Sequence, residues 1–288
     1  VGDWGTGLPR ARAVASYMAE EVAEALAHGR EAHVIHLGDV YYSGLPSEIQ
    51  RHVLACWPVT PGQARAGVTS WSLNGNHDMY SGGYGYFQTL LGDPRFAAQR
   101  SADGAATSFF RLTSPSWDFA ALDTSWDEDV LFKGATGVLQ DPQADFVAGI
   151  ARDSGRKLVL LSHHQLMSAY DQADLGPVLP GRLGPVLDGG RVTAWWWGHE
   201  HRCMGFQPGQ GVPFARCLGH GGVPVLQPHA PGDPVPAPGA WEERGFLEDS
   251  DGNHWARFGF AVLDLDGGQI QVRYRDDLGT LVRSEVIG

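Results

Sequence analysis

The residues best suited to chemistry are aspartates, asparagines and histidines in five short motifs. Each motif follows a predicted strand and contains a carboxylate, an amide oxygen or an imidazole. In chain order they read Gly2-Asp3-Trp4-Gly5, Gly38-Asp39-Val40-Tyr41-Tyr42, Gly75-Asn76-His77-Asp78, Ser162-His163-His164 and Gly198-His199-Glu200-His201. Open α/β sheets build their sites in loops at the carboxyl ends of strands. This mixture of donors suits zinc, iron and manganese. The motifs together therefore predict a metal centre.

Each motif also has a structural explanation when it is considered alone. A Gly-Asp pair after a strand is typical of a turn, and so is the Asn-Gly-Asn run at 74–76. A pair of adjacent histidines is more often solvated than bound to metal. The last motif is stronger, because His199 and His201 point the same way on an extended segment. Five such motifs in one chain favour a metal centre over five unrelated turns.

The elements that position these motifs are predicted from hydrophobic periodicity and turn residues. Helices are expected over 8–28, 47–56 and 141–151, and strands over 32–37, 68–73, 107–112, 117–122, 157–161, 192–197, 258–265, 269–274 and 281–286. The early alternation of strands and helices predicts a largely parallel sheet, whereas the last three strands predict a meander. Residues 170–190 and 227–255 lack periodicity and are expected to be long loops, either functional lids or mobile segments.

We expect one domain over 1–288, whose first strand begins before Val1. The run Trp195-Trp196-Trp197 is expected to pack in the core on both faces of its strand.

Composition excludes several classes of protein. The formal net charge of -12 argues against a general binder of nucleic acid or of anionic membranes. A hydrophobic content of 43% argues against disorder, and the chain has no apolar run long enough for a membrane span. Cys203 and Cys217 could form a disulfide or stay reduced, and the compartment and the oligomeric state stay open.

The five motifs together resemble the calcineurin-like metallophosphoesterase superfamily, over roughly residues 1–201. One departure is informative: Gly5 stands where most members have a histidine. Purple acid phosphatases share that glycine and have a tyrosine three residues after the second aspartate, a position that Tyr42 occupies. The chain therefore resembles the purple acid phosphatase branch. The resemblance implies a four-layer α/β/β/α sandwich of two mixed sheets, with a dimetal site in the loops at strand ends.

The resemblance also implies a ligand set for two metal ions. One ion would be bound by Asp3, Tyr42 and His201, the other by Asn76, His163 and His199, with Asp39 bridging both. His163 aligns with the single histidine of the family's fourth motif and is preferred to His164. A tyrosinate ligand favours Fe(III) at the first position, with Fe, Zn or Mn at the second. Tyr41 is expected to be a packing aromatic.

The remaining polar residues are expected to act on the substrate. The resemblance implies that His77 is a catalytic group. Asp78 either orients the ring of His77 or caps the local backbone. His164 is a second candidate to stabilise the transition state or to protonate the leaving alkoxide. Arg202 is either a phosphate contact or a surface arginine, and His220 is a candidate substrate contact.

The expected function is hydrolysis of a phosphate monoester by a metal-activated hydroxide at the binuclear site. The partner would be a small phosphorylated substrate. The chain has neither a Gly-x-Ser-x-Gly elbow nor a P-loop, which agrees with a mechanism that uses no protein nucleophile. The alternatives are phosphodiester hydrolysis, of a cyclic nucleotide or a glycerol or lipid diester, and a non-catalytic scaffold with the same fold.

Overall fold

Two groups of parallel strands end where the motifs begin. In the computed structural model, which describes residues 1–127, 137–171 and 178–288, β1 (His33–His36) pairs in parallel with β2 (Thr69–Ser72). The strands β4 (Trp117–Ala121), β5 (Lys157–Ser162) and β6 (Val192–Trp197) are also parallel neighbours. Parallel strands have their carboxyl ends at one edge of the sheet, so the loops that follow them lie close together.

The larger sheet is mixed and has seven strands in the order β3-β4-β5-β6-β8-β7-β9. Its other members are β3 (Phe110–Thr113), β7 (Cys203–Phe206), β8 (Phe214–Leu218) and β9 (Gly239–Glu242). The strands β7 and β8 are antiparallel neighbours that carry Cys203 and Cys217, and both cysteines are free thiols.

The end of the chain forms the antiparallel meander expected from the sequence. Its strands are β12 (Gly259–Asp266), β13 (Gln269–Asp276) and β14 (Leu281–Ile287), in that order across the sheet. A separate hairpin consists of β10 (Phe246–Glu248) and β11 (His254–Ala256).

The helices differ widely in length. They are α1 (Pro9–Ala27), α2 (Pro46–Glu48), η1 (Ile49–Leu54), α3 (Pro61–Arg65), α4 (Asn76–Met79), η2 (Gly85–Leu90), η3 (Pro94–Gln99), α5 (Asp141–Asp153) and α6 (Val178–Asp188). Pro9 opens α1, where the missing N–H costs no hydrogen bond, and Val14, Met18 and Val22 form its buried face. Among the described residues, none of the helices is long and apolar enough to cross a membrane.

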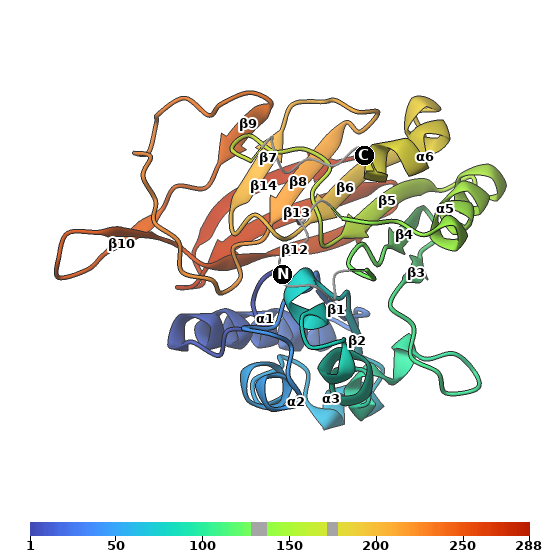
Figure 1. The fold of residues 1–288 in the computed structure, drawn as a ribbon, viewed down its shortest axis with the longest axis horizontal. Helices are drawn as coiled ribbons and strands as arrows, with labels where there is room; N and C mark the ends of the chain where they lie inside the picture. Colours follow the sequence, from blue (N-terminus) through green and yellow to red (C-terminus); the bar gives the residue numbers. More distant parts are fainter. Residues whose placement is uncertain (128–136, 172–177) are drawn as a thin grey trace.

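These elements form four layers, which confirms the predicted sandwich (Figure 1). The helices α5 and α6 cover one face of the seven-stranded sheet, and its other face packs against β12–β14 and the β1–β2 pair. The helix α1 and the short helices cover the outer side of this second layer. Trp195 and Trp197 lie in the core under α5 and α6, whereas Trp196 lies between the two sheets, as their alternation along β6 predicts.

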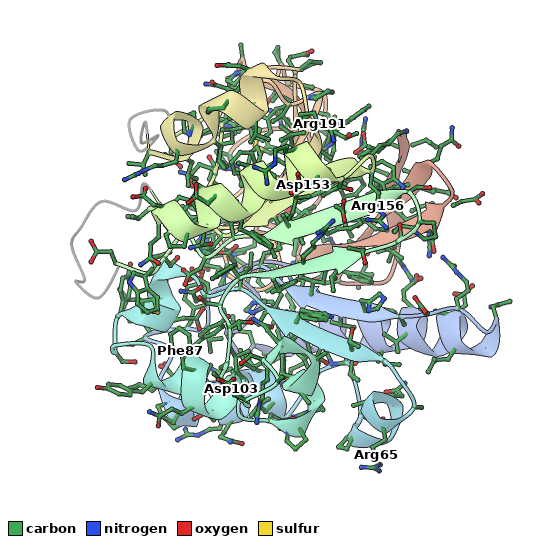
Figure 2. All side chains as sticks on the ribbon, turned by 90° about the vertical axis from the view of Figure 1, so that its right-hand side faces the viewer. Arg65, Phe87, Asp103, Asp153, Arg156 and Arg191 are labelled. Atoms are coloured by element: carbon green, nitrogen blue, oxygen red, sulfur yellow. The ribbon has the colours of Figure 1, made fainter. Side chains whose placement is uncertain are left out.

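The C-terminal end of α5 is fixed by an arginine from the loop before β6. The Arg191 guanidinium donates to the carbonyl oxygens of Ala151 and Ser154 at 2.9 and 2.7 Å (Figure 2). These carbonyls belong to the last turn, where no helical N–H can reach them.

Both segments that were expected to be long loops contain regular structure. The prediction for 170–190 was wrong over α6; residues 172–177 of that segment lie outside the described residues. Leu179, Leu183, Val186 and Leu187 form a buried face at helical spacing, although prolines and glycines between them obscure the pattern. The prediction for 227–255 was likewise wrong over β9, β10 and the first residues of β11. These strands are only three or four residues long and separated by turns, so they leave little alternation to detect.

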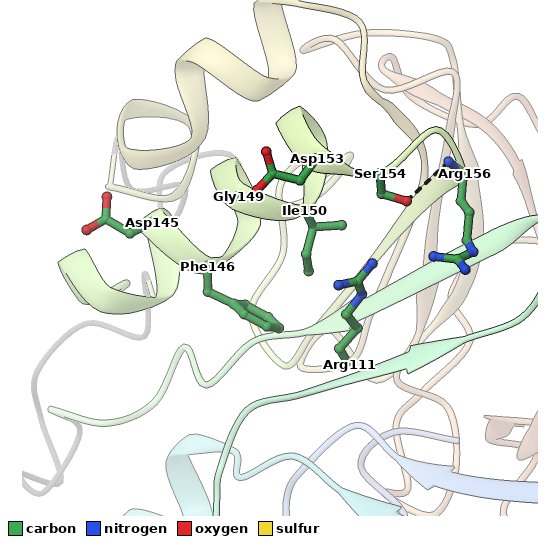
Figure 3. Close-up of a pocket in the computed structure, with 8 residues that line it drawn as sticks. All are labelled: Arg111, Asp145, Phe146, Gly149, Ile150, Asp153, Ser154 and Arg156. Atoms are coloured by element: carbon green, nitrogen blue, oxygen red, sulfur yellow. Dashed lines mark hydrogen bonds between the residues drawn. The ribbon is translucent and has the colours of Figure 1, made fainter.

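Two hollows occur away from the motif-bearing loops. The smaller, of about 300 Å³, lies beside α5 and includes Arg111 and Arg156 (Figure 3). Both arginines are ion-paired to the fully buried Asp118, at 2.8 and 3.8 Å. Both arginines of this hollow are therefore already paired with a buried carboxylate of the protein. The larger cavity, of about 560 Å³, lies between α1, β1 and β12 and is lined mainly by apolar side chains.

The central position of β5 predicts a large cost for truncating its core side chains. Leu160 is fully buried under α5 and α6, so Leu160→Ala should lower the free energy of unfolding by about 2–5 kcal/mol. Leu281→Ala, at a position 55% exposed on β14, is the matched control and should change it by less than about 0.5 kcal/mol. Urea denaturation of both variants measures the difference, and equal losses would contradict this description of the core.

Candidate metal centre

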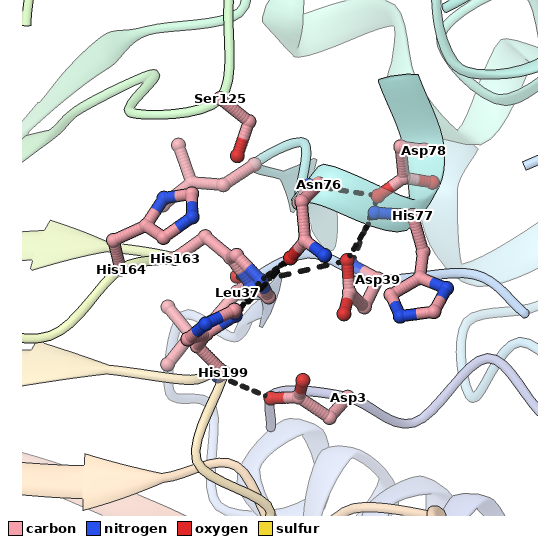
Figure 4. Close-up of polar contacts among 12 residues, drawn as sticks. Asp3, Leu37, Asp39, Asn76, His77, Asp78, Ser125, His163, His164 and His199 are labelled. Carbon is pink, nitrogen blue, oxygen red and sulfur yellow. Dashed lines mark hydrogen bonds and ion pairs between the residues drawn. The ribbon is translucent and has the colours of Figure 1, made fainter. Parts of the chain in front are cut away.

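The loops after β1, β2, β5 and β6 bring the motif residues together in one place (Figure 4). Two glycines make this approach possible. A Cβ on Gly75 would lie 2.0 Å from Asp39 Oδ1, and a Cβ on Gly198 would lie 2.6 Å from Asp3 Oδ2. Any other residue at either position would displace an aspartate that the sequence identifies as a metal ligand.

The first group of donors consists of Asp3, Asp39 and His201. One ligand atom from each lies within 4.8 Å of the others, and His201 Nε2 is 3.5 Å from Asp3 Oδ1. The Tyr41 hydroxyl lies among them, 3.1 Å from Asp3 Oδ1 and 2.9 Å from both Asp39 Oδ2 and His201 Nε2. Two carboxylates, an imidazole and a phenol thus face one another.

The second group is joined to the first by Asp39. Asn76 Oδ1 lies 3.0 Å from His163 Nε2 and 3.1 Å from His199 Nδ1, and the two nitrogens are 3.2 Å apart. His163 Nε2 is also 3.4 Å from Asp39 Oδ1. Because His163 Nδ1 lies 2.9 Å from the carbonyl oxygen of Leu37, the neutral ring keeps its proton on Nδ1 and presents a lone pair on Nε2.

This convergence of electron pairs is the observation that fits a metal ion. Three atoms that can each act as an acceptor meet within hydrogen-bond distance, and two of them belong to the almost fully buried Asn76 and His163. Acceptors so arranged repel one another unless a proton or a cation lies between them. Oxygen and imidazole nitrogen donors are suitable ligands for zinc, iron or manganese.

The backbone at three of the candidate ligands is in the left-handed region. Asp3, Asp39 and His199 have φ of 55°, 76° and 68°, and Gln210 is the only other non-glycine residue with positive φ in the described ranges 1–127, 137–171 and 178–288. This conformation is unfavourable for residues with a Cβ and tends to occur at functional sites.

The charges of the cluster shift the pKa values of its members. Burial raises the pKa of the Asp39 carboxyl, but the neighbouring His163 and His77 and the hydrogen bonds from Tyr41 and the His77 N–H outweigh it, so the pKa is lowered. Burial lowers the pKa of His163, but the Asp39 and Asp3 carboxylates outweigh it, so the pKa is raised. His199 has its pKa lowered well below its usual value by burial and by the neighbouring histidines. His199 is therefore neutral at pH 7, which is the form that binds metal.

Asp78 fixes the two loops rather than the ring of His77. Its Oδ2 accepts the backbone N–H of Asp39 at 2.9 Å and that of Gly75 at 2.8 Å. Its carboxyl is almost fully buried, and burial together with the charge of Asp39 raises its pKa to about 7. Of the two roles that the sequence allowed, the contacts agree with backbone capping.

His77 and His164 both lie beside the donors. The backbone N–H of His77 donates to Asp39 Oδ1 at 3.0 Å, and its ring Nδ1 lies 2.7 Å from the carbonyl oxygen of Tyr42. His164 is buried, with Nδ1 at 3.0 Å from Thr124 Oγ1. One of its nitrogens lies within 4.8 Å of ligand atoms of His163 and His199. Thr124 is a contact that no sequence motif indicated.

The structure reverses the expected roles of the two adjacent tyrosines. Tyr41, expected to be a packing aromatic, has its hydroxyl in the cluster, whereas the side chain of Tyr42 is 62% exposed. Glu48 explains the difference, because its carboxylate accepts the N–H groups of Tyr42, Ser43 and Leu45 at 2.6–3.0 Å and so fixes the turn. Spacing from Asp39 alone did not reveal this turn.

Of the two expected substrate contacts, Arg202 is paired with a glutamate and His220 is buried. Arg202 donates to Glu242 at 2.7 Å and lies 4.3 Å above the ring of Tyr170, so its guanidinium is already paired. His220 is 5% exposed, and burial lowers its pKa to about 3. Its ring lies against Gly259, where a Cβ would approach Nε2 to 2.7 Å. It lies in the core rather than on an open surface.

Comparison with known proteins gives the family and the fold. A profile described as Calcineurin-like phosphoesterase matches residues 1–203, and no curated protein matches the chain. A search of solved structures matches GAP50, the anchor in the inner membrane complex of Plasmodium, with a TM-score of 0.65 and 11% identity, over 100% of this chain and 87% of that one.

Two phosphatases are also similar in structure. Purple acid phosphatase PPD1 from yellow lupin (Lupinus luteus) seeds is 16% identical, with a TM-score of 0.57, over 94% of this chain. The match covers 48% of the lupin chain, so this chain spans about half its length. A dimetal phosphatase from Danio rerio is 15% identical, with a TM-score of 0.54, over 95% of this chain and 88% of that one. At these identities the likeness shows a shared fold.

Two substitutions separate the two roles considered for Asp78. Asp78→Asn keeps an acceptor for the N–H groups of Asp39 and Gly75, so metal content and turnover should stay within about tenfold of wild type, about 1.4 kcal/mol. Asp78→Ala removes the acceptor and should lower both more strongly, with a loss of unfolding free energy of about 1–3 kcal/mol. Elemental analysis and steady-state kinetics test this. An Asn variant as inactive as the Ala variant would instead indicate that the carboxyl takes part in chemistry.

Proposed function

Because the chain belongs to the calcineurin-like phosphoesterase family, we propose that it hydrolyses a phosphate monoester at a binuclear metal site, with the whole of 1–288 as the catalytic domain. The observation that carries this proposal is the pair of donor groups joined by Asp39. Asp39 Oδ2 lies 2.9 Å from the Tyr41 hydroxyl in the first group, and Asp39 Oδ1 lies 3.4 Å from His163 Nε2 in the second.

The proposed ligands are divided between two ions. Asp3, His201 and a tyrosine would hold one, Asn76, His163 and His199 the other, and Asp39 would contact both. When bound, two such ions supply Lewis-acid charge and an activated water for an in-line displacement. We assign Fe(III) to the position next to the tyrosine, with Fe, Zn or Mn at the other.

The residues of the chain provide orientation and proton transfer. The backbone N–H of His77 and the Tyr41 hydroxyl hold the Asp39 carboxylate in one orientation. The ring of His77 is partly exposed, and its Nδ1 is held by the carbonyl of Tyr42, which leaves Nε2 to exchange a proton with the leaving oxygen. His164, held by Thr124, is the second candidate for this role.

A scaffold with this fold is the alternative from another class. It has one observation in its favour, because a similar structure is described as an anchor in Plasmodium. Against it, each of the five motifs in this chain keeps at least one residue of a metal-binding type. Phosphodiester hydrolysis is the alternative among enzymes.

One experiment separates the three functions. Protein purified without chelator should contain about two metal ions per chain and hydrolyse 4-nitrophenyl phosphate faster than bis(4-nitrophenyl) phosphate. Asn76→Ala removes the oxygen on which His163 and His199 converge, and it should lower turnover by at least about a hundredfold, 2.7 kcal/mol or more. Faster hydrolysis of the diester would show a diesterase. A folded protein that takes up no metal and hydrolyses neither ester would show a scaffold.

The two tyrosines can be distinguished by colour. If Fe(III) is bound by Tyr41, concentrated protein should show a visible charge-transfer band that Tyr41→Phe abolishes and Tyr42→Phe retains. The reason is that the Tyr41 hydroxyl contacts Asp3, Asp39 and His201, whereas Tyr42 is largely exposed. Absorption spectra of the iron-loaded proteins measure this. Loss of the band in Tyr42→Phe alone would restore the sequence-based assignment.

A further inference from the structure

Large apolar side chains are exposed around the helix that carries Asn76 and His77. The rim, defined as Tyr42, Leu45, Tyr84 and Trp126, has exposed fractions of 62%, 43%, 62% and 49%. Aromatic rings so exposed lose the stabilisation that burial would give them. A contiguous apolar patch beside a polar cluster is typical of a binding surface.

Contacts between neighbouring loops connect the members of the rim. The loop before η2 packs on the turn that follows Tyr42, because Ser81 Oγ donates to the carbonyl of Ser43 at 2.7 Å. In the same place a Cβ on Gly85 would lie 1.9 Å from the carbonyl oxygen of Gly44, so the residue that follows Tyr84 lies directly against this turn. At the other end of the rim, Phe87 of η2 (Figure 2) contacts Trp126, with ring centroids 6.3 Å apart.

The two ends of the rim reach the two sides of the candidate metal centre. The ring of Tyr42 lies 5.1 Å from the ring of His77 in an edge-on arrangement. Trp126 follows Ser125, whose hydroxyl points into the space between His164 and Asn76 (Figure 4). A group attached to a phosphate held between these histidines would extend over the rim.

The two arginines that pair with Glu242 are directed to that carboxylate rather than to the rim. The Arg202 guanidinium, the cation next in sequence to the ligand His201, is paired with Glu242. Arg244 is paired with the same carboxylate at 2.8 Å. Both guanidinium groups are held by a protein carboxylate in this structure, whereas the side chains of the rim are exposed.

We propose that the rim binds the aromatic group of an aryl phosphate monoester, and so makes phosphate esters of planar aromatic alcohols the preferred substrates. This inference rests on the proposed function, since it places the phosphoryl group at the metal centre. Offset or edge-on contacts with Trp126 and Tyr84 would supply the affinity for the ring.

The test compares two esters that differ in the group on the phosphate. For wild type, the KM for 1-naphthyl phosphate should be at least about tenfold lower than that for ethyl phosphate. Trp126→Ala and Tyr84→Ala should each raise the KM for 1-naphthyl phosphate by about tenfold and leave that for ethyl phosphate unchanged. Leu281→Ala, 55% exposed on β14, is the control and should change neither value.

Binding is measured in parallel, so that failure of the function and failure of the rim are separated. If metal-loaded wild type hydrolyses neither ester, the proposed function fails, and calorimetric titration with 1-naphthyl phosphate still tests the rim. The inference about the rim is overturned if both esters have the same KM or dissociation constant, or if the two variants behave like Leu281→Ala. It is also overturned if the variants keep their preference for 1-naphthyl phosphate but lose sedimentation with phosphatidylcholine vesicles, because the rim would then be a membrane contact.

Discussion

The carboxylate of Asp39 is the contact on which the arrangement of the centre depends. It lies between the two groups of donors, and hydrogen bonds from Tyr41 and from the His77 N–H hold its two oxygens. Asp78 Oδ2 accepts hydrogen bonds from the backbone N–H of Asp39 and from that of Gly75. These two hydrogen bonds therefore hold the loops after β1 and β2 at a fixed separation. A displaced Asp39 would separate the donor groups without disturbing either sheet.

The acidity of the chain acquires a different meaning at this centre. Over the whole sequence, 33 acidic residues against 21 basic ones would repel a phosphate. Asp3 and Asp39, however, lie buried among imidazoles in a geometry that suits cations, and bound cations would reverse the local sign. Arg202, next in sequence to His201, is paired with Glu242. If the proposed function holds, recognition of phosphate would depend on bound metal rather than on a basic groove.

The sequence predicted most of the fold and most of the cluster. β6 was predicted exactly, and α1 and the meander to within one or two residues, because their periodicity extends over long segments. The helix α6 was missed, since Pro185 and neighbouring glycines conceal its buried face. The exchange of Tyr41 and Tyr42 had no signal in the spacing of the motif, because it depends on Glu48 closing the turn from outside. The contact of Thr124 with His164 joins residues 40 positions apart, which no local pattern shows.

The left-handed backbone at Asp3, Asp39 and His199 places conformational strain on three candidate metal ligands. Each such residue costs the folded state about 1–3 kcal/mol, a strain that glycine at the same position would relieve. Glycine at any of these positions would relieve the strain and remove a candidate metal ligand in the same step. Stability and ligand supply are therefore opposed at these three positions, which is the trade-off expected of a functional site.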